Sequence, residues 1–538
     1  MSAIRVDVVL ICYQDQGNLG MGYLAAVLQQ HGHTVEMVDV RDEPAQIAAR
    51  LSDRQPLVVG FSLIFQAFLP QFRRVASHLR LVGITSHFTI GGHFASLCHD
   101  ELLAHFPELD SVVRYEGEQT LLELVERLKG GEDWRDIHGI VYSDAGRVVE
   151  TEARALVADL DSLPFPHRPY EADRLGGFLT LPLLASRGCA RRCSFCSIHT
   201  FYRTAPGKVV RVRKPAKVVE EMLDLERYRQ VRIFLFQDDD FPLWRAVGRR
   251  WATELADRLH DSGLADRTIW KISCRAEYVD ADLFAMLRDA GLFLVYMGIE
   301  SGVEAGLEVL HKQMTVEQNL TGVQTLKELG ILFGYGFMLF DPSSSFESVR
   351  ENIGFLRQIV GDGSAAACFS RMLPYGGTPI RDQLQKEGRL RGDLTHPDYV
   401  FLDPRLNDYH RLLSQVVRPW IHGEGLSYQL NYAWDELETV RRLVPGVVGL
   451  EQYRLALQSL TKESNEQLFR LVEESSIAFE AGDRSLLDTA AVQHYCQVNV
   501  PRLISLRNNF IAENIYLLHD ASRFDPATAG PVIAPQVH

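Results

Sequence analysis

The stretch Ser186-Arg-Gly-Cys189-Ala-Arg-Arg-Cys193-Ser-Phe-Cys196 gathers three of the eight cysteines of this 538-residue chain. Three thiolates at this spacing can bind one soft metal centre, and three protein ligands leave one coordination position open for chemistry. The other five cysteines are dispersed, as small buried side chains usually are. They are Cys12, Cys98, Cys274, Cys368 and Cys496. The cluster predicts a metal site in a reducing compartment and argues against a disulfide framework. An alternative is a structural zinc site in which His199 is the fourth ligand.

The composition indicates a large folded protein with more than one domain, since 46% of the residues are hydrophobic and 23% are charged. Asp and Glu number 70 against 56 Lys and Arg, and this acidic balance disfavours nucleic acid as a partner. Apolar runs such as 291–299 are far shorter than the roughly 20 residues of a membrane-spanning helix. The N-terminus has no signal-peptide pattern, so we expect a cytoplasmic protein without a membrane partner.

Six β-α repeats surround and follow the cysteine segment and predict a partial (β/α)6 barrel, open on one side. The predicted strands are 178–185, 231–236, 268–273, 293–299, 332–340 and 365–372. The predicted helices are 215–227, 244–262, 281–290, 303–310, 316–329 and 345–359. The cysteines directly follow the first strand. Sites in such barrels lie at the carboxyl ends of the strands.

A second alternating pattern precedes the barrel and predicts a doubly wound, Rossmann-like parallel sheet. Its predicted strands are 6–12, 34–40, 57–64, 87–91 and 111–113. Glycines follow three of these strands, where such sheets bind ligands. They are Gly17, Gly20 and Gly22, then Gly91 and Gly92, and then Gly117. A dinucleotide-binding sheet is disfavoured because the first three glycines lack the Gly-x-Gly-x-x-Gly spacing.

The predicted domains follow one another along the chain. Residues 1–132 form the N-terminal sheet, 133–177 a Pro-rich linker, 178–402 the barrel and 403–538 a C-terminal α-helical domain. We expect the helical domain to close the open side of the barrel, with a packing or dimerisation domain as the alternative. The end of the chain, from Asp525, is expected to be a disordered or draped tail.

The cysteine pattern, C-x₃-C-x₂-C with Phe195 before the third cysteine, resembles the signature of the radical S-adenosylmethionine superfamily. The resemblance implies that Cys189, Cys193 and Cys196 hold a [4Fe-4S] cluster whose fourth iron is chelated by S-adenosyl-L-methionine. The reduced cluster would cleave that molecule to a 5′-deoxyadenosyl radical, which abstracts hydrogen from a substrate.

Later strand ends resemble the places where this superfamily binds S-adenosylmethionine. Acidic residues replace the commoner Gly-Gly-Glu after the second strand, and they can still accept hydrogen bonds from an ammonium group. The binding residues implied by the resemblance are Phe195, Gln237, Asp238, Asp239, Ser273, Arg275 and Glu300.

The N-terminal sheet resembles the cobalamin-binding domain of the B12-dependent branch of the superfamily. The matching pieces are Leu19-Gly-Met-Gly-Tyr, Val59-Gly-Phe-Ser62, Ile90-Gly-Gly-His93 and Tyr115-Glu-Gly-Glu118. The cobalamin-binding residues implied are Gly20, Gly22, Ser62, Leu63, Phe65, Gly91, Gly92, His93, Glu116 and Gly117. The Asp-x-His-x-x-Gly motif that supplies a lower cobalt ligand elsewhere is absent, so the loop at 63–66 is expected to cover the lower face.

The resemblance implies a cobalamin-dependent radical enzyme, most often a methyltransferase that acts on an unactivated carbon or a phosphinate phosphorus of a small molecule. One S-adenosylmethionine would convert cobalamin to methylcobalamin, and a second would make the radical. The branch also contains enzymes that rearrange, oxidise or cyclise their substrates without methylation. An electron donor resembling flavodoxin or ferredoxin is implied as a partner.

Two further alternatives keep only part of this pattern. A tRNA methylthiotransferase is disfavoured by the acidic charge and by the lack of a recognisable RNA-binding end domain. A zinc-stabilised cobalamin carrier or sensor would need His199 as a ligand and would leave the barrel motifs without a role. No residue is assigned to catalysis from the sequence, and the substrate is not identified.

Overall fold

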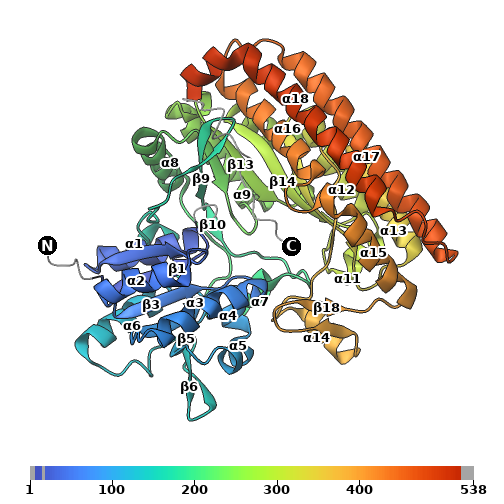
Figure 1. The fold of residues 1–538 in the computed structure, drawn as a ribbon. Helices are drawn as coiled ribbons and strands as arrows, with labels where there is room; N and C mark the ends of the chain where they lie inside the picture. The colour runs from blue at the N-terminus through green and yellow to red at the C-terminus, as the bar shows by residue number, and fades with distance from the viewer. Residues whose placement is uncertain (1–5, 15–17, 523–538) are drawn as a thin grey trace. The chain divides into compact units, whose positions relative to one another are not determined.

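Residues 6–14 and 18–522 are described by the computed structural model, and they form two seven-stranded sheets with helices packed around them (Figure 1). Gly17 and the tail from Asp525 lie outside the described residues. The chain divides into two compact units that interleave along the sequence. The first unit joins the residues up to Glu171 with Ser186–Arg213 and Leu373–Tyr399. The second unit joins Ala172–Ala185, Lys214–Met372 and the residues from Val400 onward.

The first unit is built on a sheet in the order β2-β1-β3-β4-β5-β6-β7. The five strands expected from the sequence, β1 to β5, are present and parallel, which confirms the Rossmann-like fold class. They are β1 (Val8–Cys12), β2 (Val35–Asp39), β3 (Val58–Ser62), β4 (His87–Gly91) and β5 (Ser111–Val113). The helices between them are α1 (Leu19–Gln30), α2 (Pro44–Arg54), α3 (Leu69–Leu81), α4 (His93–Leu97), α5 (His99–His105) and α6 (Glu118–Gly130).

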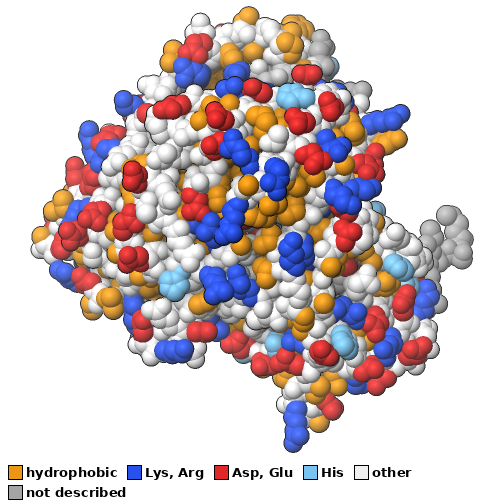
Figure 2. All heavy atoms as spheres, turned by 180° about the vertical axis from the view of Figure 1, so that it is seen from behind, with side chains coloured by type: hydrophobic (Ala, Val, Ile, Leu, Met, Phe, Trp, Pro, Cys, Tyr) orange, Lys and Arg blue, Asp and Glu red, His pale blue; other side chains and the backbone are white. Residues whose placement is uncertain are grey.

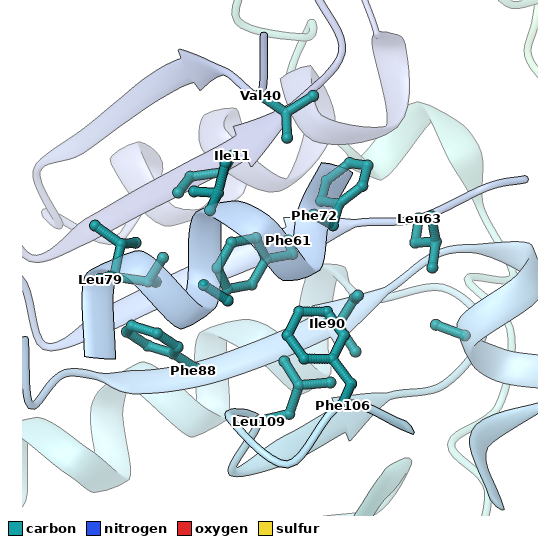
Figure 3. Packing of buried hydrophobic residues seen from close by; sticks show 14 of the residues in the cluster. Ile11, Val40, Phe61, Leu63, Phe72, Leu79, Phe88, Ile90, Phe106 and Leu109 are labelled. Atoms are coloured by element: carbon teal, nitrogen blue, oxygen red, sulfur yellow. The ribbon is translucent and has the colours of Figure 1, made fainter. Parts of the chain in front are cut away.

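Aliphatic and aromatic side chains together fill the core on one face of this sheet (Figure 3). Phe61 of β3 contacts Phe72 of α3 and Phe88 of β4, with ring centroids 6.4 and 5.7 Å apart. All five residues of β1 are buried, as a central strand covered on both faces requires. This packing fixes the loops that follow the strands at one edge of the sheet.

The segment expected to be a linker contains a hairpin that extends the sheet. Strand β6 (Ile140–Asp144) pairs antiparallel with β5, and β7 (Arg147–Glu150) pairs with β6. The connection is the two-residue turn Ala145-Gly146, in which both residues have positive φ. The sequence pattern missed this hairpin because the strands are short and the edge strand carries mostly exposed side chains.

The second unit is built on a curled half-barrel sheet in the order β16-β15-β14-β13-β12-β9-β8. Strands β9 to β16 of this sheet run parallel, and the extra edge strand β8 is antiparallel. The strands are β8 (Asp173–Leu175), β9 (Phe178–Leu183), β12 (Ile233–Phe236), β13 (Ile269–Cys274), β14 (Leu292–Glu300), β15 (Leu332–Phe340) and β16 (Ser370–Arg371). The helices are α8 (Pro215–Arg229), α9 (Arg245–Asp261), α10 (Ala281–Asp289), α11 (Glu304–Val309), α12 (Val316–Glu328) and α13 (Phe346–Val360). The partial barrel expected from the sequence is therefore confirmed.

The sixth barrel strand, β16, is much shorter than the expected 365–372. The amide of Ala366 donates to Asn431 Oδ1, that of Ala367 to Asn465 Oδ1 and that of Cys368 to Tyr335 Oη. Side chains from distant elements thus satisfy amides that a longer strand would have paired in the sheet.

The C-terminal region is helical, as expected, and its four helices pack against one another within the second unit (Figure 1). They are α15 (Pro404–Ile421), α16 (Leu426–Leu443), α17 (Leu450–Glu480) and α18 (Thr489–Ser522). Helix α17 packs on α13, and α16 contacts the edge strand β8 as well as β14 and β15. Among the described residues, no helix combines the length and the apolar character that a membrane crossing needs.

Acidic and basic side chains are interspersed over the molecular face in Figure 2. That mixture agrees with a formal net charge of −14 spread over a large chain, in which 70 acidic residues accompany 56 basic ones.

Candidate functional site

The cysteine loop connects β10 (Ser186–Arg187) to helix α7 (Ser197–Thr204), and both belong to the first unit. Strand β10 pairs antiparallel with β11 (Arg211–Val212). Gly188, directly before Cys189, has φ +86°, and a Cβ there would lie 2.1 Å from the carbonyl oxygen of Val209. Only glycine fits this position. The β10–β11 hairpin therefore fixes where the cysteine loop begins.

The three cysteines suit a cluster that takes one thiolate per iron. Cys193 is buried, and Cys189 and Cys196 are half-buried. The amide of Arg191 donates to Cys189 Sγ at 3.5 Å, an interaction that stabilises a thiolate. Within the described residues, three potential ligand atoms lie within 4.8 Å of one another only at His99, Asp100 and Glu150. The three cysteine sulfurs are therefore not all within 4.8 Å of one another.

His199, the ligand of the zinc alternative, lies in the first turn of α7. Its Nδ1 atom is buried and accepts or donates no hydrogen bond. Burial, with Arg203 and Arg192 nearby, lowers the pKa of His199. A neutral imidazole can bind a metal, so the ring alone does not separate zinc from a cluster. Elemental analysis of iron, sulfide and zinc distinguishes a zinc site from an iron–sulfur cluster.

The end of β12 in the second unit carries the acidic run expected to bind S-adenosylmethionine. Gln237 and Asp239 are exposed, whereas Asp238 between them is buried. Both carboxylate oxygens of Asp238 accept from the amide of Ala185, at 3.1 and 3.2 Å. Asp238 therefore joins the ends of β12 and β9, and the expected contacts of Gln237 and Asp239 with S-adenosylmethionine stay predictions.

Ser273 and Arg275 lie at the end of β13. The half-buried Ser273 accepts from the amide of Phe241 through its carbonyl oxygen. Arg275 is buried and donates to Glu277 and to the carbonyl oxygen of Lys312, the latter at 2.5 Å. The guanidinium thus supports a neighbouring turn in this structure, and its expected contact with S-adenosylmethionine stays a prediction.

Glu300 ends β14 at an irregularity in the pairing with β15 and has φ +66°. Such a conformation is costly for a residue other than glycine and is often found at functional sites. Its Oε1 accepts from Lys312 Nζ at 3.0 Å, and both side chains are largely buried. A Cβ on Gly298 would lie 2.6 Å from Glu300 Oε1 and 2.7 Å from Lys312 Nζ, so the glycine makes room for this pair. Sequence motifs gave no signal for Lys312.

Two neighbouring strand ends in the first unit meet at Gly92. Ser62 of β3 pairs with Gly91 of β4, and the amide of Leu63 donates to the carbonyl oxygen of Gly91 at 2.8 Å. Gly92 has φ +107°, and a Cβ there would lie 2.4 Å from the carbonyl oxygen of Leu63. Glycine at this position therefore lets the loop after β3 approach β4.

His93 begins α4 beside this contact, and its Nε2 atom is buried without a hydrogen-bond partner. Burial lowers the pKa of His93 to about 4, so the ring is neutral near pH 7. A buried unpaired ring nitrogen is rare in native proteins. It fits a polar group of a bound ligand, and cobalamin carries several amides.

The remaining residues expected to bind cobalamin differ in their surroundings. Gly20 is exposed in the first turn of α1, whereas a Cβ on Gly22 would lie 2.7 Å from the carbonyl oxygen of His167. Phe65 contacts Tyr375, with ring centroids 5.8 Å apart. A Cβ on Gly117 would meet Leu24 and Val113 at 3.3 Å.

Glu116 has protein partners for both carboxylate oxygens. Arg187 Nη1 donates to Oε1 at 3.2 Å, and Arg211 Nη1 donates to Oε2 at 2.7 Å. The amide of Val157 also donates to Oε2. Neither arginine was singled out from the sequence, although Arg187 is only two residues before Cys189.

Two family models match the chain. A model described as "B12 binding domain" matches residues 6–125, and one described as "Radical SAM superfamily" matches residues 183–356. The first covers the sheet of the first unit. The second begins at the last residue of β9 and ends within α13, so it includes the cysteine loop.

Curated relatives align over about three quarters of the chain. An uncharacterised methyltransferase of Pyrococcus horikoshii is 28% identical over 404 residues, which are 74% of this chain and 84% of the relative. Anaerobic magnesium-protoporphyrin IX monomethyl ester cyclase of Rubrivivax gelatinosus is 29% identical over 418 residues, 74% of this chain and 72% of the relative. Hopanoid C-3 methylase of Methylococcus capsulatus is 28% identical over 422 residues, 76% of this chain and 75% of the relative.

A solved structure supports the same fold. The cobalamin-dependent S-adenosylmethionine radical enzyme OxsB, with aqua-cobalamin and S-adenosylmethionine bound, superposes with a TM-score of 0.67. The superposition covers 96% of this chain and 83% of that one at 18% identity.

Proposed function

The chain belongs to the cobalamin-dependent branch of the radical S-adenosylmethionine superfamily, and from that premise we propose that it methylates a small molecule at an unactivated carbon or a phosphinate phosphorus. One observation carries the proposal: a B12-binding sheet and a three-cysteine loop are present in the same compact unit of a chain that also has the half-barrel. Relatives named as methyltransferases support it.

The cofactors are a [4Fe-4S] cluster, S-adenosylmethionine and cobalamin, which together supply a carbon radical and a transferable methyl group. Cys189, Cys193 and Cys196 would hold the cluster. Gln237, Asp239 and the Glu300 carboxylate would bind polar groups of S-adenosylmethionine, because they stand at the carboxyl ends of barrel strands. Lys312 would hold the Glu300 carboxylate in a fixed orientation through their ion pair.

Cobalamin would lie at the strand ends of the first unit, where His93 offers an unpaired buried nitrogen. We also propose Gly92 and the loop at 63–66 as its closest backbone contacts. The electron donor is proposed to resemble flavodoxin or ferredoxin, since the cluster must be reduced before it can act. The cytoplasmic location stays a prediction.

A product mass measurement tests methyl transfer. Anaerobically reconstituted protein is incubated with a candidate substrate, a reductant and S-adenosylmethionine that carries a deuterated methyl group. A product in which a trideuterated methyl group has replaced one hydrogen atom supports the proposal. Conversion of the substrate without gain of the label contradicts it.

Rearrangement, oxidation or cyclisation without methylation is the second candidate. It is favoured by the similarity to a cyclase of Rubrivivax gelatinosus over most of both chains. The same assay identifies it, because 5′-deoxyadenosine would form together with an unlabelled product.

A further inference from the structure

Two glutamates and two arginines form a buried ion-pair network beside the cysteine loop. Arg187 Nη2 lies 2.7 Å from Glu118 Oε1, and Arg187 Nη1 lies 3.2 Å from Glu116 Oε1. Arg211 Nη1 lies 2.7 Å from Glu116 Oε2. The exposed fraction of the four side chains is between 2% and 10%. Their charges balance within a site that excludes water.

The network compensates the repulsion between two arginine charges on the hairpin that begins the cysteine loop. Arg187 and Arg211 are directly opposite each other in the β10–β11 pair, where two like charges repel. Burial disfavours an uncompensated guanidinium charge, and the carboxylates of Glu118 and Glu116, at 2.7 and 3.2 Å, compensate the charge of Arg187. Because Glu116 contacts both arginines, its carboxylate offsets the repulsion between them across the hairpin.

Glu116 and Glu118 flank Gly117 at the end of the cobalamin sheet, whereas Arg187 is two residues from Cys189. We propose that Glu116 and Glu118 are positioning residues that hold the iron–sulfur loop at a fixed place on the cobalamin sheet, acting through Arg187 and Arg211. The proposal rests on the proposed function, since it requires both cofactors. It assigns these carboxylates a role other than contact with the corrin.

The far end of the loop is held by the same sheet. Phe201 of α7 contacts His93 at the start of α4 and Tyr115 after β5, with ring centroids 4.3 and 5.6 Å apart. His93 and Gly117 are also expected cobalamin contacts. The two anchors of the loop are therefore immediate neighbours of the proposed corrin site, all within one compact unit.

The middle of the loop has a third attachment. The carbonyl oxygen of Ser194, between Cys193 and Phe195, accepts from the amide of Ile380 at 3.0 Å. Ile380 is the second residue of helix α14 (Pro379–Lys386), which belongs to the first unit as well. The amide of Gly376, just before this helix, donates to Gln66 Oε1 at 2.8 Å, in the loop after β3. Three attachments over so short a segment leave the cysteines little freedom relative to the sheet.

The test measures the separation of the two cofactors, and not turnover. Full-length protein is reconstituted anaerobically with iron, sulfide and cobalamin, and the load of each is measured. Pulsed electron paramagnetic resonance then records the spin–spin interaction between the reduced cluster and cob(II)alamin. The variants are Glu118→Gln, which removes one charge at constant shape, and Arg187→Lys, which keeps the charge but loses the paired donors.

Glu123→Gln is the matched control. Glu123 lies on α6 like Glu118 and is also paired with an arginine, Arg154, but that pair does not touch the loop. We expect a narrow distribution of cluster-to-cobalt distances in the wild type and in the control. In both network variants the distribution should widen about twofold, because a positioned group loosens when its supporting contacts are lost.

The outcomes separate the two claims. Wild-type protein that does not hold both cofactors would overturn the proposed function and this inference with it. Network variants that hold both cofactors with an unchanged distance distribution would overturn the inference alone. A lower cofactor load with an unchanged distribution in the loaded molecules would do the same, since it shows a merely structural role.

Discussion

Each cysteine of the loop supplies a different thiolate, and the loop contains no spare one. We predict that replacing Cys189, Cys193 and Cys196 by Ala removes the iron–sulfur absorbance and reduces S-adenosylmethionine cleavage to background. Cys496→Ala is the control, because that thiol is buried in α18 of the second unit. The assignment would be wrong if the triple variant kept its iron–sulfur absorbance. It would also be wrong if the wild-type protein contained zinc as its bound metal.

Gly92 allows a second prediction at the scale of one atom. In Gly92→Ala the new Cβ would meet the backbone of Leu63 at 2.4 Å, which no side-chain rotation can relieve. We expect cobalamin retention to fall about tenfold, while the cysteines still bind iron, because the loop after β3 must move. Retention is measured by absorbance after gel filtration.

Gly83→Ala is the matched control for this prediction. Gly83 also has a positive φ, of +88°, but nothing lies within 4 Å of its Cβ position. That change should cost only the backbone strain of about 1–2 kcal/mol. Equal loss of cobalamin in the two variants would mean that strain, and not the contact with Leu63, matters at Gly92.

At the scale of elements, local patterns predicted most of the barrel. Helix α12 begins at Val316 as expected because Thr315 and Gln318 form a capping box that is visible in the sequence. Strand β16 was overestimated because its amides bond to Asn431, Asn465 and Tyr335, and no local pattern encodes such partners.

The candidate site shows the same division between local and distant interactions. The cysteines were predictable because all three lie within one loop. The partnership of Glu116 with Arg187 joins residues 71 positions apart, so the sequence led to an expected corrin contact for Glu116 and left Arg187 unassigned. The roles of the S-adenosylmethionine and cobalamin residues remain predictions.

Helix α16 contributes a pH-dependent interaction to the second unit. Burial raises the pKa of Asp435 to about 7, and Lys271 of β13 opposes that rise. A carboxyl group whose pKa is raised on folding stabilises the fold below its unfolded pKa, and this contribution is lost as the pH rises through its folded pKa. The loss therefore falls between about pH 4 and pH 7.

We predict that Asp435→Asn raises the stability of the protein relative to the wild type more at high pH than at low pH. The melting temperature of the variant relative to the wild type should be higher at about pH 8 than at about pH 5, because the amide never ionises. Differential scanning fluorimetry at the two pH values measures this. A difference that is independent of pH would contradict the assigned titration of Asp435.

At the scale of the whole molecule, the C-terminal helices are part of the second unit. Asn465 of α17 donates to the carbonyl oxygens of Val360 and Ala365 and accepts from Ala367, all buried. We predict that a chain ending near Arg405 will not accumulate as folded protein, because these groups and the α13 face would be exposed. A soluble truncated chain that binds iron and cobalamin would contradict this prediction. It would favour the expected role of the helices as a lid, because a lid can be removed while the barrel stays folded.

The two units interleave, so that the cysteine loop and the cobalamin sheet share one unit while the expected S-adenosylmethionine residues of the barrel strands belong to the other. Sequence order alone places the loop with the barrel. The consecutive domains expected from the sequence therefore describe the order of the elements, whereas the contacts group them differently.

Transfer of a labelled methyl group to cobalamin is the first reaction that the proposed function requires, and its measurement needs no knowledge of the substrate. Reconstituted protein is incubated under reducing, anaerobic conditions with S-adenosylmethionine that carries a deuterated methyl group, and the bound cobalamin is analysed by mass spectrometry. We expect deuterated methylcobalamin to form on the protein. Protein that holds full complements of cluster and cobalamin, yet leaves the cobalamin unmethylated, would contradict it.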